Sequence, residues 1–365
     1  MKRLGACVVF VIAAAAWAGH ELPIYPSFYP HEIKIRTIAP DQAAGAMRDG
    51  TLHAYLGPGL QMTGGPPEQI GTVESLGAFV VVRVNPQSPV ANDNACSAVR
   101  TVIRALGPGG FFPHPYPVTP FHGDYLHHAD LADAARTRLA DGNPMSGLKI
   151  KASDALALTG WSAQGNDWDV EVLEVDAAGL VESAMRATNG LIAPPWLKAG
   201  WFHAERLLAD ATVDPALRQR IEADRTRLMT GEYSDLPERI NLERDLVSAL
   251  ASNCQSIVAG YTVKREYINV DFSAGIENIG FDSVSGLHSP MFFRTVKLKD
   301  FPWNGWLALG TQAKPSAAWN PIGGMNDRFG QLVGFAVTDP ALLPAPYEAG
   351  WMLNRIADLP TNAGR

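Results

Sequence analysis

Histidines and carboxylates are concentrated between His114 and Asp130, and zinc and copper accept both groups as ligands. Two ligands on one face of a helix need a spacing of i and i+4. His122 and His127 are five residues apart, and the neighbouring His127 and His128 diverge on a helix. These three histidines are the candidate metal ligands. Because their spacing does not suit a preformed site, we expect no bound metal.

Aromatic and hydroxyl side chains near the N-terminus have the chemistry to bind a small molecule. Tyr25 and Tyr29 can stack on a ligand, and Ser27, which lies between them, can donate a hydrogen bond. The competing interpretation is an N-terminal arm whose rings pack against the protein surface, because aromatic side chains bury a large area wherever they lie. The sequence leaves both interpretations open.

A second aromatic group, Trp196 and Trp201 with His203, follows a segment that we expect to be a strand. A tryptophan face attracts ammonium groups within about 6 Å, so a site for a cation is one interpretation. Burial in the core is the commoner explanation for any single tryptophan. Trp196 is the stronger ligand-binding candidate because it comes directly after the strand.

Sequence motifs of the common enzyme classes are absent. The chain holds no Gly-x-Ser-x-Gly elbow, no His-Glu-x-x-His pair and no Gly-x-x-x-x-Gly-Lys phosphate loop. Glu277 and Asp282 lie in a glycine-rich stretch, where isolated carboxylates are usually solvated. Nothing identifies a nucleophile. We therefore expect a protein that is not an enzyme and has no cofactor.

Two segments far apart in the chain have the same pattern, and they are the elements that position the aromatic candidates. Each contains a strand, an amphipathic helix, a glycine that ends the helix, and a second strand that leads into a proline turn. The first comprises residues 33–38, 41–48, 49–50, 52–56 and the turn 57–58; the second comprises 170–175, 176–186, 189–190, 191–193 and 194–196. A strand–helix–strand unit forms a parallel, right-handed crossover, so each copy is expected to build its own small α/β sheet.

Further elements lie between and after the two copies. The apolar pattern predicts strands at 79–84, 148–150 and 261–272, and helices at 95–106, 126–139, 204–208, 215–230 and 242–252. With 47% hydrophobic and 18% charged residues, the composition is typical of a globular protein. The chain is longer than one hydrophobic core usually supports, which favours two lobes.

The N-terminus has the layout of a cleaved secretory signal. Lys2 and Arg3 precede an apolar run at 6–16, and the small residues Ala16 and Ala18 end it. Residues 1–18 are therefore the predicted signal peptide, and the protein is expected in the periplasm. No later stretch approaches the roughly 18 apolar residues of a membrane helix, so we expect no membrane-spanning segment.

Charge and cysteine usage limit the partners and the covalent structure. The formal net charge is −7 and no basic stripe is present, so a nucleic-acid partner is not expected. Removal of the signal takes Cys7 away and leaves Cys96 and Cys254 in a compartment where disulfides persist. They form either one long-loop disulfide or two unpaired buried thiols, and the sequence does not decide because it does not give the separation of their Cα atoms.

The two copies resemble the type II periplasmic solute-binding proteins, most nearly their phosphonate-type and nitrate/taurine-type branches. The resemblance rests on the first strand, the alanine-rich helix, Asp49 and Gly50, the strand that closes on Gly57 and Pro58, and the same order at 177–195. It covers residues 22–196. It implies a two-lobed α/β fold, each lobe a small sheet flanked by helices. Open α/β sheets bind ligands at the carboxyl ends of their strands, which agrees with a ligand site between the lobes.

The resemblance also implies domains, site residues and a function. Residues 19–90 are the first part of lobe 1, 91–200 are lobe 2, and 201–365 return to lobe 1 with a helical, tryptophan-rich extension. The implied function is capture of a small polar or anionic ligand for an ABC importer permease. Alternatives are a periplasmic accessory protein, such as a partner of a quinoprotein dehydrogenase, and a histidine-rich metal-binding protein. The expected ligand-binding residues are Tyr25, Ser27, Tyr29, Tyr55, Gly57, Pro58, Trp196, Trp201 and His203.

Overall fold

The computed structural model describes residues 30–356 except 92–93, 107–110, 141–142, 154–164, 166, 189–193, 212–213, 272, 300–304 and 317–326. The predicted signal peptide and the N-terminal aromatic candidates Tyr25, Ser27 and Tyr29 lie outside the described residues. Among the helices that are described, none has both the length and the apolar character needed to cross a membrane.

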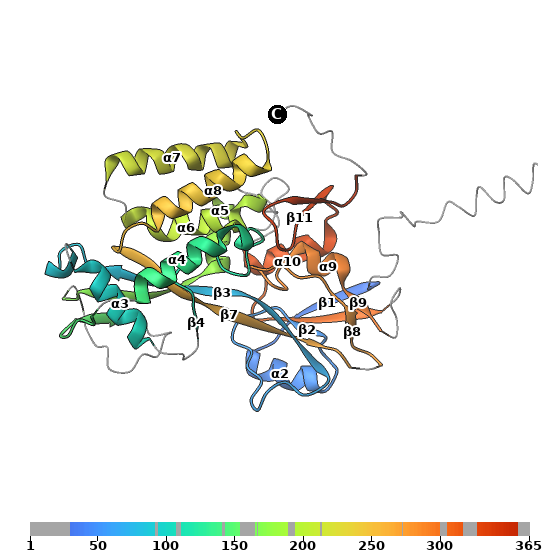
Figure 1. The fold of residues 1–365 in the computed structure, drawn as a ribbon. Helices are drawn as coiled ribbons and strands as arrows, with labels where there is room; N and C mark the ends of the chain where they lie inside the picture. The colour runs from blue at the N-terminus through green and yellow to red at the C-terminus, as the bar shows by residue number, and fades with distance from the viewer. Residues whose placement is uncertain are drawn as a thin grey trace, which may run out of the picture.

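The fold is mixed α/β, with one large sheet flanked by helices (Figure 1). Its strands follow the order β1-β10-β2-β7-β3-β6-β5, and β4 pairs with β7. Their bounds are β1 Glu32–Thr37, β2 Ala54–Tyr55, β3 Ile70–Val84, β4 Phe112–Pro113, β5 Ile150–Ala152, β6 Val170–Asp176, β7 Ser256–Asn269 and β10 Trp306–Thr311. Two small antiparallel sheets accompany it: β8 Ile276–Asn278 with β9 Lys297–Leu298, and β11 Leu342–Pro344 with β12 Trp351–Leu353.

Two long antiparallel strands, β3 and β7, run through the whole sheet and divide it into two halves. Their pairing extends from Ile70 opposite Asn269 to Arg83 opposite Ser256, with irregular register between residues 76 and 79 and between 80 and 81. The first half contains β1, β10 and β2 at one end of this ladder. The second half contains β6, β5 and β4 at the other end. The halves are therefore parts of one continuous sheet.

The first copy of the repeated pattern forms the crossover that the sequence predicts. The strands β1 and β2 both pair in parallel with β10, which lies between them. Helix α2, Pro40–Arg48, connects the two strands and buries Ala43, Ala44 and Met47. Proline at the first position and an extended residue before it suit a helix start, because that N–H would have no partner in the helix.

The second copy is described only in part. Strand β6 leads into helix α5, Ala177–Thr188, where the Asp176 carboxylate accepts a hydrogen bond from the Gly179 backbone N–H at 2.8 Å. The expected second strand at 191–193 lies outside the described residues. The expectation of a separate sheet for each copy is wrong, because β1, β2 and β6 belong to the same eight-stranded sheet, joined through β3 and β7.

The second half of the sheet is covered on both faces. Phe79 and Val81 of β3 face one core with helices α6, Gly200–Leu208, and α8, Leu236–Leu250, whereas Val80 and Val82 face another with α3, Ala95–Ala105. Burial on both faces explains why this part of β3 is a continuous apolar run. Helix α4, Ala129–Ala140, contributes Ala132 and Ala135 to the first of these cores. Helices α6 and α8 therefore pack on the second half of the sheet.

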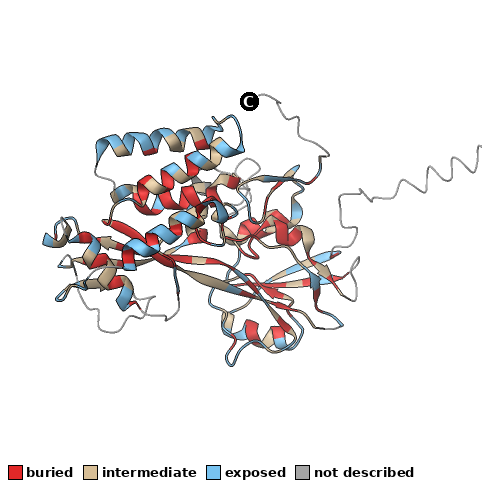
Figure 2. Cartoon of the chain, viewed as in Figure 1, coloured by how far each residue is buried: buried red, intermediate tan, exposed pale blue. Residues whose placement is uncertain are grey.

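Helix α7, Pro215–Thr230, forms the outermost layer above α8, and Figure 2 shows that most of its surface is exposed. It begins at the Asp214 cap, whose carboxylate accepts a hydrogen bond from the Ala216 N–H, and ends at Gly231 with φ 74°.

The first half of the sheet has its own core, which contains Leu307 and Leu309 of β10. Helices α9, Pro290–Thr295, and α10, Arg328–Val337, contribute phenylalanines to this core.

A disulfide ties helix α3 to the start of β7. Cys96 and Cys254 are bonded, with their Cα atoms 5.0 Å apart. The sequence did not determine whether these two cysteines are paired, and the structure shows that they form a disulfide. It closes a loop of 158 residues that includes β4, β5, β6 and the helices α4 to α8.

Candidate functional site

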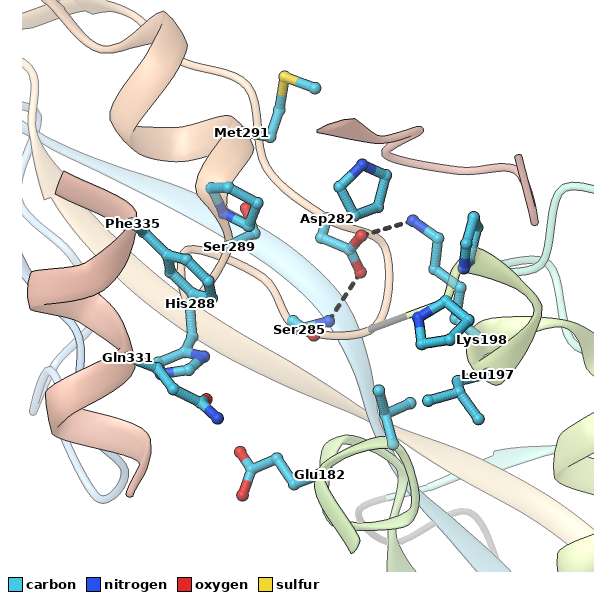
Figure 3. Close-up of a pocket in the computed structure, with 15 residues that line it drawn as sticks. Glu182, Leu197, Lys198, Asp282, Ser285, His288, Ser289, Met291, Gln331 and Phe335 are labelled. Atoms are coloured by element: carbon cyan, nitrogen blue, oxygen red, sulfur yellow. Dashed lines mark hydrogen bonds and ion pairs between the residues drawn. The ribbon is translucent and has the colours of Figure 1, made fainter. Parts of the chain in front are cut away.

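A cavity of about 70 Å³ lies where the helices of the two halves meet, and we call it the inter-half cavity (Figure 3). The second half contributes α5 and the single 3₁₀ turn Pro195–Lys198 that follows the second copy. The first half contributes the loop before α9, the start of α9, α10 and β11. The lining residues are Val181, Glu182, Pro194, Pro195, Leu197, Lys198, Asp282, Ser285, His288, Ser289, Pro290, Met291, Gln331, Phe335 and Pro344.

One wall of the cavity is a buried ion pair between the halves. Lys198 Nζ lies 2.6 Å from Asp282 Oδ2, and the two side chains are only 8% and 9% exposed. Lys198 also donates to the Ala345 carbonyl. Asp282 Oδ1 accepts from the backbone N–H groups of Val284 at 2.9 Å and Ser285 at 3.0 Å. The expectation of a solvated carboxylate at Asp282 is therefore wrong, because the loop folds inward onto the lysine.

A second ion pair crosses the opposite side of the cavity. Glu182 Oε1 of α5 lies 3.5 Å from Arg328 Nη1 at the first residue of α10. Both side chains are partly exposed, so solvent weakens this attraction relative to that between Lys198 and Asp282. Together the pairs hold the second half against the first on two sides of one cavity.

His288 lines the first-half wall and is almost wholly buried. Its Nε2 donates to the Arg328 carbonyl at 2.7 Å. Burial, and then the positive charge of Arg328, lower the pKa of His288 to about 3. The imidazole is therefore neutral at physiological pH, and it fixes the first turn of α10 through a hydrogen bond.

Acid is expected to destabilise the protein through His288. The unfolded chain binds a proton near pH 6.5 whereas the folded chain does so near pH 3, so the free energy of unfolding falls as the pH drops below about 6.5. We expect the urea midpoint of the parent to fall more between pH 7 and pH 4.5 than that of His288→Gln, which keeps a donor for Arg328. Equal falls in the two proteins would show that His288 does not contribute.

Gln331 contributes a polar side chain to the wall of the cavity. The residue as a whole is only 4% exposed. Figure 3 shows the amide pointing from α10 toward Glu182 across the cavity. A side-chain amide both donates and accepts hydrogen bonds, so Gln331 can bind a polar group of a ligand or a water molecule in the cavity.

The aromatic candidates of the second copy lie beside the cavity rather than in its wall. Trp196 stacks on Trp201 with ring centroids 5.9 Å apart, and Trp201 is buried in the core of the second half. The neighbours of Trp196 on both sides, Pro195 and Leu197, do line the cavity. His203 is fully buried and its Nδ1 lies 2.9 Å from His122 Nε2.

The candidates of the first copy lie in the first half, away from the inter-half cavity. Tyr55 is in the core against α2, and its buried hydroxyl has no hydrogen-bond partner among the described residues. Gly57 approaches the Tyr55 ring so closely that a Cβ at this position would lie 2.8 Å from it. Pro58 is exposed on the turn. The structure thus brings Tyr55 and Gly57 together, but in a different place from Trp196.

The three histidines considered as metal ligands do not converge. His122 bonds to His203, His128 Nδ1 lies 2.9 Å from the Tyr116 hydroxyl, and His127 is exposed.

Two residues that line the cavity, Lys198 and Gln331, were not predicted from the sequence. Lys198 directly follows the second copy, so a charged residue in an otherwise apolar segment was the available signal. Gln331 left no such signal, because a glutamine within a helix pattern is usually exposed.

Comparisons with known proteins give structural likeness only. No protein-family model and no curated protein matches the sequence. Among solved structures, the chain is similar to NikZ from Campylobacter jejuni in complex with Ni(L-His), with 14% identity, a TM-score of 0.33, and coverage of 66% of this chain and 56% of that one.

Two peptide-binding proteins are similar to the same degree. The oligopeptide-binding protein OppA has 12% identity and a TM-score of 0.38 over 68% of this chain and 53% of that one. The oligopeptide-binding protein AppA from Bacillus subtilis, in complex with a nonapeptide, has 10% identity and a TM-score of 0.37 over 68% and 57%. The chain spans little more than half the length of these structures.

Proposed function

We propose that the protein is an exported solute-binding protein that captures a small polar ligand in the inter-half cavity. The single observation that carries the proposal is a cavity that both halves line jointly, with the side chain of Gln331 in its wall. An apolar cavity with a few convergent polar groups is the usual form of a small-molecule site. The absence of recognisable catalytic motifs in the sequence favours binding over catalysis.

The placement of the cavity supports a closing motion. A volume of about 70 Å³ holds only a few water-sized groups, so a larger solute needs the halves to separate. The ion pairs Lys198 with Asp282 and Glu182 with Arg328 join the halves and are the contacts that opening breaks. A ligand that contacts both halves would favour the closed arrangement by its greater affinity for it.

The charges around the cavity define the ligand class more narrowly. Lys198 and Asp282 neutralise one another, as do Glu182 and Arg328, so no wall presents an unpaired charge among the described residues. The polar groups that remain are the Gln331 amide and the hydroxyls of Ser285 and Ser289, beside apolar Leu197 and Phe335. A small, uncharged polar solute fits this lining best. Delivery of that solute to an ABC importer is the finer part of the proposal.

Native mass spectrometry of the exported protein, purified without denaturation, tests the proposal. We expect a retained small molecule on the parent and a reduced retained fraction on Gln331→Leu. Loss of a buried hydrogen bond costs about 1–3 kcal/mol, which weakens binding by roughly 5-fold to 150-fold. The variant should fold normally, because leucine is close to glutamine in size and the cavity is already lined by apolar Leu197 and Phe335.

Gln87→Leu is the matched control, because Gln87 is exposed and lies away from the cavity. This variant should retain the molecule as the parent does. Retention of the same molecule at the same level by Gln331→Leu would place its site elsewhere. A parent that retains nothing, and whose melting temperature is unchanged by amino acids, sugars and short peptides, would contradict the function itself.

A further inference from the structure

Three potential metal ligands converge outside the inter-half cavity. Ligand atoms of Asp124, His128 and Glu243 all lie within 4.8 Å of one another. Asp124 and His128 come from the turn that leads into α4, and Glu243 comes from the inner face of α8. His128 is fully buried, and Glu243 is 3% exposed.

Two atoms of this group face each other without a hydrogen-bond partner among the described residues. His128 Nε2 and Asp124 Oδ2 are both buried and unpartnered, and the distance between them is 3.8 Å, too long for a hydrogen bond. Two ligands of one tetrahedral zinc ion, each about 2.0–2.2 Å from the metal, are roughly 3.5 Å apart. The observed separation therefore suits two ligands of one metal better than a direct contact.

The surroundings orient the imidazole for coordination through Nε2. Its other nitrogen, Nδ1, lies 2.9 Å from the Tyr116 hydroxyl, which is itself buried. A metal-bound histidine commonly donates its second ring N–H to a polar partner, and that bond fixes which nitrogen meets the metal. Asp130, the other carboxylate of this segment, is held away by a bidentate pair with Arg244 at 2.7 Å.

The spacing of the ligands agrees with the local backbone. Asp124 lies at the start of the 3₁₀ turn Tyr125–His128 and His128 at its end, and their side chains approach to 3.8 Å across this turn. Glu243 completes the set from a helix distant in sequence, with Arg239 Nε 3.4 Å from its Oε1. Two carboxylates beside a neutral imidazole supply the charge that a divalent ion needs.

We propose that Asp124, His128 and Glu243 form a binding site for a divalent transition-metal ion, best probed with zinc, which accepts imidazole and carboxylate ligands in tetrahedral geometry. The Asp124 side chain is 12% exposed and gives the ion a way in. Three protein ligands leave the fourth coordination position for water. The site is independent of the proposed solute function, because none of its residues lines the inter-half cavity.

Zinc titration of the full-length exported protein, freed of metal and carrying no histidine tag, tests this site. We expect calorimetry to show one equivalent of zinc bound by the parent. His128→Gln should abolish this binding. Tyr116→Phe, which removes only the group that orients the imidazole, should weaken it by about 10-fold to 100-fold. Cobalt substituted for zinc should give the visible absorption of a tetrahedral ion.

The adjacent His127 provides the matched control, because His127→Gln removes an exposed imidazole one residue away and should leave zinc affinity unchanged. Glu243→Gln, nearly identical in shape, checks the result if His128→Gln folds poorly, and it should also lose zinc. Circular dichroism verifies the fold of each variant. A parent without stoichiometric zinc, or folded His128→Gln and Glu243→Gln proteins that bind like the parent, would overturn the assignment.

Discussion

Lys198→Met is expected to destabilise the protein by about 3–5 kcal/mol, because it leaves the Asp282 carboxylate buried without its counter-charge. The methionine keeps the length of the side chain, so the lost interaction and not a cavity is what the variant measures. Urea unfolding followed by circular dichroism gives the change in the free energy of unfolding. Because the pair joins the halves, hydrogen exchange should also accelerate in the loop before α9.

Two further variants separate the ion pair from other effects. Lys149→Met removes an exposed lysine paired with Asp167 and should barely move the urea midpoint, since solvent screens such pairs. The double variant Lys198→Met with Asp282→Asn removes both charges but keeps the oxygen that accepts from Val284 and Ser285. It should recover most of the loss. A double variant as unstable as Lys198→Met would show that the buried charge is not the cause.

Removal of the disulfide is expected to have an effect of similar size. Closing a loop of 158 residues restricts the unfolded chain, and the chain-entropy account assigns about 5 kcal/mol to a loop of this length. Replacing both Cys96 and Cys254 with Ala should therefore lower the free energy of unfolding by about this amount. Urea unfolding in the absence of reductant measures it.

Reduction of the parent is the natural comparison for the double alanine variant. Dithiothreitol should bring the urea midpoint of the parent close to that of the variant and should leave the variant unchanged. Thiol titration of the unfolded, unreduced protein, prepared without residues 1–18 and hence without Cys7, should find no free thiol. Two free thiols in that titration would contradict the bridge, whatever the stability of the variant.

The helices were predictable from the sequence where local signals agree. The predicted helix 215–230 has the bounds of α7, because Asp214 caps it, proline occupies its first position and Gly231 ends it in the left-handed region. Helix α8 was predicted to begin at 242 but begins at Leu236. Its first turn buries no residue, and the first residue of the helix that is buried is Leu242. The apolar period therefore marks position 242 and not the start of the helix, although Asp235 provides a cap.

The strands show where the pattern fails. The predicted strand 79–84 is only the doubly buried part of β3, whose first residues alternate with exposed Thr72 and Glu74. The continuity of β3 across both halves was therefore not visible, and neither was the single sheet. The spacing of apolar residues shows which face of a strand is buried, but it does not show which strands pair. The pairing of β3 depends on β7, which lies more than 170 residues away in the sequence.

The sites depend even more on contacts distant in sequence. Lys198 and Asp282 are 84 positions apart, and neither predicts the other. For the metal ligands part of the signal was local. Asp124 and His128 have the spacing of i and i+4, which no pair among His122, His127 and His128 has. Glu243 could not be added without the packing of α8.

The position of β10 between β1 and β2 determines when this protein can fold during its synthesis. β1 and β2 do not pair with each other, and β10 is formed by residues 306–311. The N-terminal crossover must therefore remain an incomplete unit with unpaired strand edges until residues 306–311 have been made. Contacts of such high sequence separation slow folding and leave apolar strands exposed meanwhile. In a ribosome-bound chain that ends before residue 306, the strands β1 and β2 should thus remain accessible to protease even after long incubation.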